Sequence, residues 1–362
     1  MQFYSLFYFL DYSYLNLLCI KDIRGGFLII QSLIQSLSTE IIMETQDKEN
    51  MLTVIIPNYN HAPYLKERIE SVLNQLYQDF EVIILDDCSS DNSREIIEQY
   101  RNHPKVSHIV FNEVNSGSTF KQWQKGISLA KGEYIWIAES DDVAHPEFLK
   151  SIMVEMEKDN EIVLGFSAIQ GIDSDGNKIP GYTLSTYTHT TVMDGMEFIK
   201  KNMVFGCHIL NASSVVFKKE IAYKIPKDYM SLKTAGDYLF WIEIASKGKV
   251  VKVPKKLDYF RQHERKVTPN AVKTGLQFEE VFKIFQILDS RNLLKPMHRK
   301  LAIGFWMDRV KKEKSKFQSS QILNKIYDLW KVSKTKRGYY RLLYIINGVG
   351  RKLKKKYLGY SI

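Results

Sequence analysis

The chain is poor in the features that mark several common classes of protein. It has only three cysteines in 362 residues (Cys19, Cys88 and Cys207), and they show neither metal-site spacing nor an even-numbered disulfide framework. We therefore expect free thiols in a reducing compartment. The sequence also contains neither a GxGxxG nor a Walker A motif, so the glycine-rich backbone cradles for phosphate are absent. It has no internal repeat and no long low-complexity linker.

Residues 1–42 are apolar and aromatic but lack the pattern of a signal peptide or a membrane span. No basic residue precedes MQFYSLFYFLDYSYLNLLCI, and Asp11 interrupts it before about 18 apolar residues have accumulated. Three interpretations compete: an interfacial anchor, a weak transmembrane helix, or sequence upstream of a start at Met43 or Met51. We favour the last, because the polar METQDKENM leads directly into a strand. Residues 1–50 are thus expected to be an extension that is untranslated or disordered.

Acidic residues are scarce toward the C-terminus. From Arg299 to Lys356 there are 18 lysines and arginines against three acids. This excess is larger than the net charge of +10 on the whole chain, so the remainder is net acidic. Such a basic segment can serve nucleic acid, anionic lipid or solubility alone. The hydrophobic content of 44% and charged content of 25% are otherwise those of a soluble globular protein.

Apolar runs alternate with polar turns and helical patterns in the first half of the chain. The runs predicted to be strands are residues 52–56, 80–85, 106–111 and 134–138. Strands that alternate with helices predict an α/β fold with a mostly parallel sheet flanked by helices. Further on we expect a hairpin turning at Asp175–Gly176, a strand-like stretch in FGCHILNASSVVFKK, and a helix from Gly236 to Gly248. From about residue 275 onward the chain is predicted to be helical and basic.

Three polar motifs, PNYN, DDCSSD and ESDD, each follow a predicted strand. In a parallel sheet such strand ends share one edge, which is where ligands bind. The close carboxylates of ESDD repel one another unless a cation compensates. They predict a divalent metal site, or else a solvated turn in which Asp142 caps the helix near Pro146. Without a glycine loop, a bound diphosphate would need such a metal and basic side chains.

The other two motifs allow two interpretations each. Asp86 and Asp87 can accept hydrogen bonds from a nucleobase or ribose, or can cap and solvate a surface loop together with Asp91. Tyr59 can stack on a base or pack as a half-buried ring. Asp237, in AGDYLFW, opens a predicted helix and could be its N-cap.

The ordered set of motifs resembles a known family. VIIPNYNHAPYLKERIESVLNQLYQDFEVIILDDCSSDNS and GEYIWIAESDD are similar to the family 2 glycosyltransferases of the inverting GT-A type, as found in bacterial surface-polysaccharide synthesis. The resemblance spans residues 51–265 and is dense over 51–148. It implies a GT-A catalytic domain at 51–270, with a nucleotide-binding half at 51–148 and an acceptor-binding half at 149–270. A basic helical region follows at 271–362.

The resemblance also implies roles for individual residues. Pro57, Tyr59 and Asp87 would line the nucleoside pocket, with Asp87 accepting from the base. Glu139, Asp141 and His263 would form the metal site for Mg²⁺ or Mn²⁺, with Asp141 in the DXD motif and His263 closing over the metal and diphosphate.

The remaining implied roles concern the sugar, the acceptor and the diphosphate. Asp142 would support the sugar or the acceptor, and Asp237 would be the catalytic base. Two departures from the family pattern matter. Glu139 replaces the usual first aspartate with a longer side chain, and an expected arginine after NSGS is missing, for which Lys121 or Lys125 is the substitute.

The implied reaction transfers a sugar from a nucleotide diphosphate-sugar to a hydroxyl of a glycan or lipid-linked acceptor. The basic C-terminal helices, with Trp306 and Trp330 among them, would contact an anionic membrane at its cytoplasmic face, or else form a solvated helix pair or a docking face. No nucleic acid is expected as a partner. A nucleotidyltransferase is a rival, but PNYNHAPY lacks the glycine-rich basic loop that it would need. A non-catalytic nucleotide-sugar binder of the same fold is the other rival.

Overall fold

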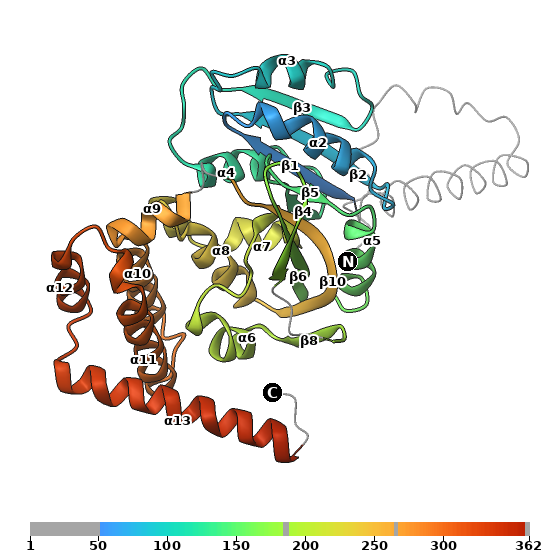
Figure 1. The fold of residues 1–362 in the computed structure, drawn as a ribbon. Helices are drawn as coiled ribbons and strands as arrows, with labels where there is room; N and C mark the ends of the chain where they lie inside the picture. The colour runs from blue at the N-terminus through green and yellow to red at the C-terminus, as the bar shows by residue number, and fades with distance from the viewer. Residues whose placement is uncertain (1–50, 184–187, 264–266, 359–362) are drawn as a thin grey trace, which may run out of the picture. The chain divides into compact units, whose positions relative to one another are not determined.

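The computed structural model describes residues 51–183, 188–263 and 267–358, so the expectation for residues 1–50 lies outside the described residues. A mixed ten-stranded sheet forms the centre, in the order β3-β2-β1-β4-β9-β6-β10-β5, with β7 paired to β6 and β8 to β10 (Figure 1). The strands are β1 Leu52–Asn58, β2 Phe80–Asp86, β3 Val106–Phe111, β4 Tyr134–Ile137, β5 Val143–Ala144, β6 Ile162–Ile172, β7 Lys178–Thr183, β8 Thr191–Asp194, β9 Val215–Lys218 and β10 Lys249–Arg261.

The first four strands are parallel, and they set the edge that matters for function. Leu52 of β1 is level with Phe80 of β2 on one side and with Tyr134 of β4 on the other. The turns after these strands therefore leave the sheet at the same edge. Every residue of β1 and β2 is buried, as expected for strands covered by helices on both faces. The predicted α/β class is confirmed.

Two hydrophobic cores lie on the two faces of the sheet. Side chains of α2, α3 and α5 fill one core, while α4, α6, α8 and helices from the C-terminal region fill the other. The predicted core tryptophans, Trp123, Trp136 and Trp241, are at most 1% exposed. The helices up to this region are α2 Ala62–Leu73, α3 Ser93–Glu98, α4 Thr119–Leu129, α5 Phe148–Met156, α6 Gly195–Lys201, α7 Lys219–Lys224 and α8 Gly236–Ala245.

Two segments differ from the expectation. The stretch 205–219 is not one strand, because only β9 is extended and short 3₁₀ turns precede it. Gly206 has φ +115°, which a glycine adopts at little cost and which interrupts an extended run. Conversely, β10 was not predicted. Pro254 and several lysines obscure its pattern, and its pairing with β6 shifts register between Val253 and Lys256.

The C-terminal region is helical, as predicted, with α9 Val267–Thr274, α10 Leu276–Ser290, α11 Pro296–Glu313, α12 Ser320–Leu329 and α13 Lys334–Leu358. Trp306 and Trp330 are 2% and 6% exposed and belong to the hydrophobic core. The idea that these two rings form a surface is therefore wrong. Among the helices described here, none combines the length and the apolar character needed to cross a bilayer.

Candidate functional site

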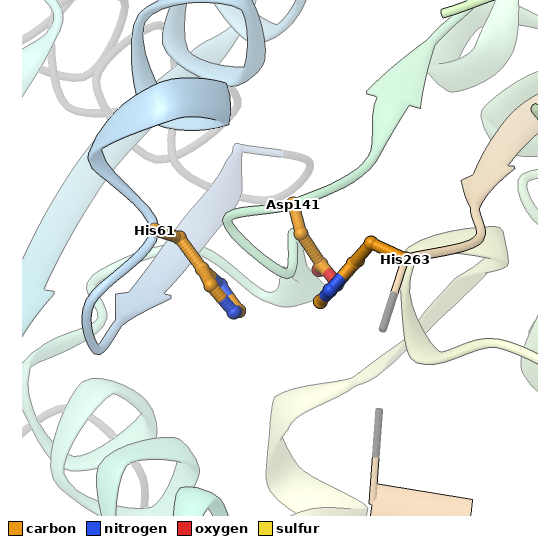
Figure 2. A group of neighbouring side chains, drawn as sticks. All are labelled: His61, Asp141 and His263. Carbon is orange, nitrogen blue, oxygen red and sulfur yellow. The ribbon is translucent and has the colours of Figure 1, made fainter. Parts of the chain in front are cut away.

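A carboxylate and two imidazoles gather where three turns meet. Asp141 lies in the turn between β4 and β5, His263 directly after β10, and His61 in the turn before α2 (Figure 2). Their ligand atoms all lie within 4.8 Å of one another. His263 Nε2 is 2.9 Å from Asp141 Oδ2, and His61 Nδ1 is 2.8 Å from Ser140 Oγ. A carboxylate oxygen and two ring nitrogens fit a divalent cation.

The structure thus brings together two of the residues predicted for the metal, Asp141 and His263, and adds His61. The sequence analysis missed His61, although it stands directly after PNYN at the same sheet edge. The carboxylate of Glu139, the third residue predicted, accepts a hydrogen bond of 2.8 Å from Trp123 Nε1 on α4. Burial and the nearby negative charge of Asp141 raise the pKa of Glu139 to about 8. Glu139 is not among the residues whose ligand atoms form the group in the described part of the chain.

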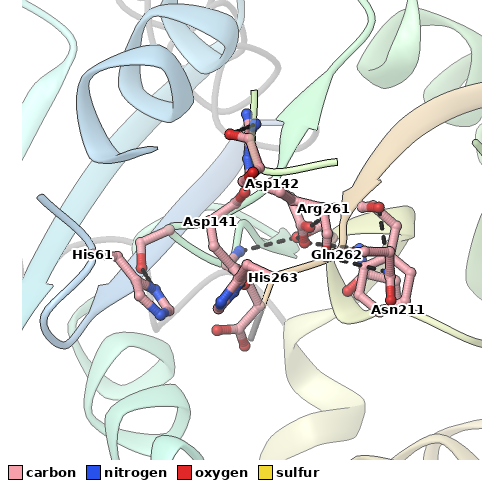
Figure 3. Close-up of polar contacts among 12 residues, drawn as sticks. His61, Asp141, Asp142, Asn211, Arg261, Gln262 and His263 are labelled. Carbon is pink, nitrogen blue, oxygen red and sulfur yellow. Dashed lines mark hydrogen bonds and ion pairs between the residues drawn. The ribbon is translucent and has the colours of Figure 1, made fainter. Parts of the chain in front are cut away.

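Asp142 is held inside the protein by three hydrogen bonds. Its Oδ2 accepts from Asn211 Nδ2 and from Ser213 Oγ, each at 2.7 Å, and its Oδ1 accepts from the backbone N–H of Arg261 at 3.0 Å (Figure 3). Burial, followed by the negative charge of Asp141, raises the pKa of Asp142 to about 6. With these partners, Asp142 fixes the turn that carries Asp141 and does not cap α5, which begins at Phe148.

Arg261, at the end of β10, joins this turn to the β6–β7 hairpin. Its side chain is 1% exposed, and its Nε donates to Asp141 O at 2.8 Å. Its Nη1 donates to the backbone carbonyls of Asp173 and Ser174 at 3.1 and 2.9 Å. Residues 173–177 form the predicted hairpin turn between paired strands, with Asp173 N–H donating to Asn177 O at 2.9 Å. The unpredicted strand β10 therefore supplies the residue that positions the turn carrying Asp141.

The carboxylate of Asp87, at the end of β2, is 5% exposed and receives four hydrogen bonds. Its Oδ1 accepts from Asn112 Nδ2, Ser116 N and Gln122 Nε2, and its Oδ2 accepts from Ser116 Oγ. Three of the four donors bind Oδ1 and one binds Oδ2, so Oδ2 is the oxygen with fewer partners. Lys121, the predicted substitute for the arginine, is held over the same loop, since its Nζ donates to Ser116 O at 2.9 Å.

Asp86, by contrast, serves the local turn. It accepts from Asn58 Nδ2 at 2.8 Å and from Ser89 N and Oγ at 2.9 and 2.6 Å. Pro57 is buried at the end of β1, whereas Tyr59 is 49% exposed and its ring is accessible for stacking. Of the aromatic and acidic candidates at these two strand ends, Tyr59 is thus the exposed one, and Asp87 is buried with a single donor on its Oδ2.

A cavity of about 670 Å³ opens beside the carboxylate–imidazole group. Its wall includes two members of that group and the tip of the β6–β7 hairpin. The lining residues are Asn60, His61, Pro63, Tyr64, Asp173, Ser174, Gln262 and His263.

Asp237 lies in the first turn of α8 and is partly buried. Its own Oδ1 accepts from Tyr238 N–H at 2.7 Å, and the N-cap position belongs to Ala235. Burial raises the pKa of Asp237 to about 6, a value suited to a base near neutral pH. Gly236 lets the start of α8 pack closely against the backbone at Tyr229, because a Cβ on residue 236 would lie only 2.6 Å from Tyr229 O.

Comparisons with known proteins point to one family of enzymes. Residues 53–221 match the model of glycosyl transferase family 2. An uncharacterized glycosyltransferase of Methanocaldococcus jannaschii is 31% identical over 194 residues, which is 53% of this chain and 63% of that protein. The putative teichuronic acid biosynthesis glycosyltransferase TuaG of Bacillus subtilis is 27% identical over 198 residues, covering 55% of this chain and 73% of TuaG.

A solved structure shares the fold. Staphylococcus aureus TarS 1–349 in complex with UDP-GlcNAc is 20% identical, with a TM-score of 0.56 over 82% of this chain and 89% of that one. The likeness confirms the predicted GT-A fold.

Proposed function

The chain carries a family 2 glycosyltransferase domain over residues 53–221, and from this premise we propose that it is a metal-dependent inverting enzyme. It moves a sugar from a nucleotide diphosphate-sugar to a hydroxyl of a glycan or lipid-linked acceptor in cell-surface polysaccharide synthesis. The observation that carries the proposal is the meeting of Asp141, His263 and His61 at the sheet edge where the family's strand-end motifs converge.

The donor would lie along this edge, over the ends of β2, β1 and β4. Asp87 Oδ2 accepts an N–H of the base, and Tyr59 stacks on its ring. A divalent cation, Mn²⁺ or Mg²⁺, would be held by Asp141, His263 and His61. The side chain of Glu139 would lie near this site. When bound, the cation offsets the charge that develops on the departing nucleoside diphosphate. Two imidazoles in the group favour Mn²⁺, because Mg²⁺ prefers oxygen ligands.

Other residues would act on the sugar, the acceptor and the diphosphate. Lys121 adds positive charge beside the diphosphate, and Asp142 supports the turn that faces the sugar. Asp237 removes the proton from the acceptor hydroxyl, which attacks C1 from the face opposite the leaving group. No covalent intermediate is needed, and the product has the inverted configuration.

The basic C-terminal region, residues 271–362, would hold the enzyme at the cytoplasmic face of the membrane. α13 has nine lysines and arginines and no acid. One side of it packs on α11, where Tyr344 meets Phe305 with ring centroids 5.5 Å apart. Leu342 and Ile346 are 54% and 58% exposed. Exposed apolar side chains on a strongly basic helix suit the surface of an anionic bilayer.

Sugar transfer by the purified protein tests the proposal. We expect one member of a panel of nucleotide sugars to release its nucleoside diphosphate in the presence of Mn²⁺ and an acceptor. Asp237→Ala should lose turnover by about 10²- to 10⁴-fold while the Kd for the nucleotide is unchanged. A protein that binds the nucleotide sugar but never turns it over would instead support the binding-protein alternative.

A further inference from the structure

A buried carboxylate from α10 binds the segment that leads into α8. Glu280 is 2% exposed and lies outside the part of the chain that matches the family model. Its Oε1 accepts from the backbone N–H of Lys233 at 2.6 Å. Its Oε2 accepts from the backbone N–H groups of Thr234 and Ala235 at 2.8 and 3.0 Å, and from Thr234 Oγ1 at 2.7 Å. All four partners are donors, as an ionised carboxylate requires.

The three amides bound by Glu280 belong to consecutive residues, and the next two residues are Gly236 and Asp237. Ala235 is the N-cap of α8, and Lys233 and Thr234 come before it, so Glu280 anchors the segment that enters the helix. Because Glu280 belongs to α10, this helix fixes the direction in which α8 begins.

The residue that follows the C-terminal end of α10 also binds α8 and the segment before it. Arg291, which follows α10, forms an ion pair with Asp228 at 2.7 Å and a second pair with Glu243. Asp228 lies before α8, and Glu243 lies within it and is 2% exposed. The two contacts hold residues 228–243 against α10 from both sides of Asp237.

We propose that Glu280 is a positioning residue for sugar transfer, which orients Asp237 by anchoring the three residues that lead into α8. The proposal rests on the role of Asp237 in the proposed function. The C-terminal helices would then complete the catalytic centre, in addition to any role at a membrane.

The electrostatics agree with this geometry. Burial is the main cause of the raised pKa of Asp237, and the negative charge of Glu280 raises it further. The thiol of Cys207 also interacts with Asp237, and it is neutral at pH 7 because burial and the charge of Asp237 raise its pKa. Removing the charge of Glu280 is therefore the direct way to test its effect on Asp237.

Glu280→Gln tests the proposal in the full-length chain. The amide keeps the shape and one acceptor oxygen but loses the charge, and its NH₂ group faces at least one of the four donors. Glu279→Gln is the matched control, because Glu279 is the adjacent carboxylate of α10 and pairs with Lys325 at 2.7 Å. Asp237 is followed by ¹³C NMR of aspartate side-chain carboxyls, with its signal assigned by Asp237→Asn. The pH dependence of kcat/KM is measured in parallel.

We expect Glu280→Gln to move the titration of Asp237 and the acidic limb of the rate profile to lower pH together, with kcat reduced on the order of tenfold because the base is less well placed. Glu279→Gln should behave as wild type. The inference is overturned if Glu280→Gln leaves the Asp237 titration unchanged, or if Glu279→Gln shifts it equally. The NMR result stands whether or not sugar transfer is found, so a failure of the proposed function is distinguishable from a failure of this inference.

Discussion

Asp237 shows how one residue's surroundings set its chemistry. Its pKa is raised to about 6, chiefly by burial. A base acts in its ionised form, so its contribution is present above this pKa and is lost as the pH falls through it. We predict that kcat/KM falls about tenfold per pH unit below about pH 6, measured as a rate profile at saturating metal. A profile that stays flat down to pH 4.5 would contradict the assignment of Asp237 as the base.

His61 provides a second test at this scale. If His61 is a ligand together with Asp141 and His263, His61→Ala should weaken Mn²⁺ binding by about 10- to 100-fold, by analogy with losses at other metal sites. Titration calorimetry with Mn²⁺ measures this directly. The control is His108→Ala, because His108 lies on β3, is partly buried, and has its Nδ1 3.1 Å from Oγ of the adjacent Ser107. Equal Mn²⁺ affinity in both variants would remove His61 from the site.

The sequence predicted the position of a residue well where a local motif or turn defines it, and poorly where its contacts come from distant parts of the chain. Asp141 and the hairpin at residues 173–177 follow from motif and turn chemistry, and the structure places both as expected. The hydrogen bond from Trp123 to Glu139 was not predictable, because 16 positions separate the two residues and only the packing of α4 brings them together. His61 could have been found, since any ionisable residue just past a strand end is a candidate.

Among the elements, β10 is the long strand that the hydrophobic pattern of the sequence did not predict. Its lysines and Pro254 give it no clean alternation, yet it pairs with three strands and ends at Arg261, two residues before His263. Trp306 and Trp330 illustrate the opposite error. Aromatic residues among lysines suggested a surface, but the helices bury both rings and expose a different face on α13.

That face of α13 supports a prediction about membrane binding. Replacing both Leu342 and Ile346 with glutamate should remove most of the binding to vesicles that contain anionic lipid, because it deletes the apolar contact and adds negative charge. Vesicle co-sedimentation of the full-length protein measures the loss. The control is Val154→Glu on α5, where Val154 is also exposed, at 48%.

Two outcomes would count against a lipid partner. One is that wild-type protein fails to sediment with anionic vesicles, or sediments equally with neutral ones. The other is that the glutamate variant changes the oligomeric state and not the vesicle binding, in which case a second copy covers this face.

In the whole molecule, the described residues place acidic and basic functions in different regions. The acidic strand-end motifs lie at one edge of the sheet, and the basic excess lies in α11 to α13. Between these regions in the sequence, α10 and the residue after it bind α8 and the segment before it through Glu280 and Arg291. This arrangement could not be predicted from composition, because the four hydrogen bonds of Glu280 depend on tertiary packing over 45 to 47 positions.

The central claim is that one metal-bound nucleotide sugar lies at the sheet edge around Asp141. The most direct measurement is the release of nucleoside diphosphate from a panel of nucleotide sugars, with Mn²⁺ or with EDTA. It would be made for wild type, for Asp141→Asn, and for Asp328→Asn as an exposed control on α12. We predict release from at least one donor that EDTA abolishes, that Asp141→Asn reduces by at least about 10²-fold, and that Asp328→Asn preserves. Release that is equally fast in EDTA and in Asp141→Asn, or no release from any donor, would contradict the account.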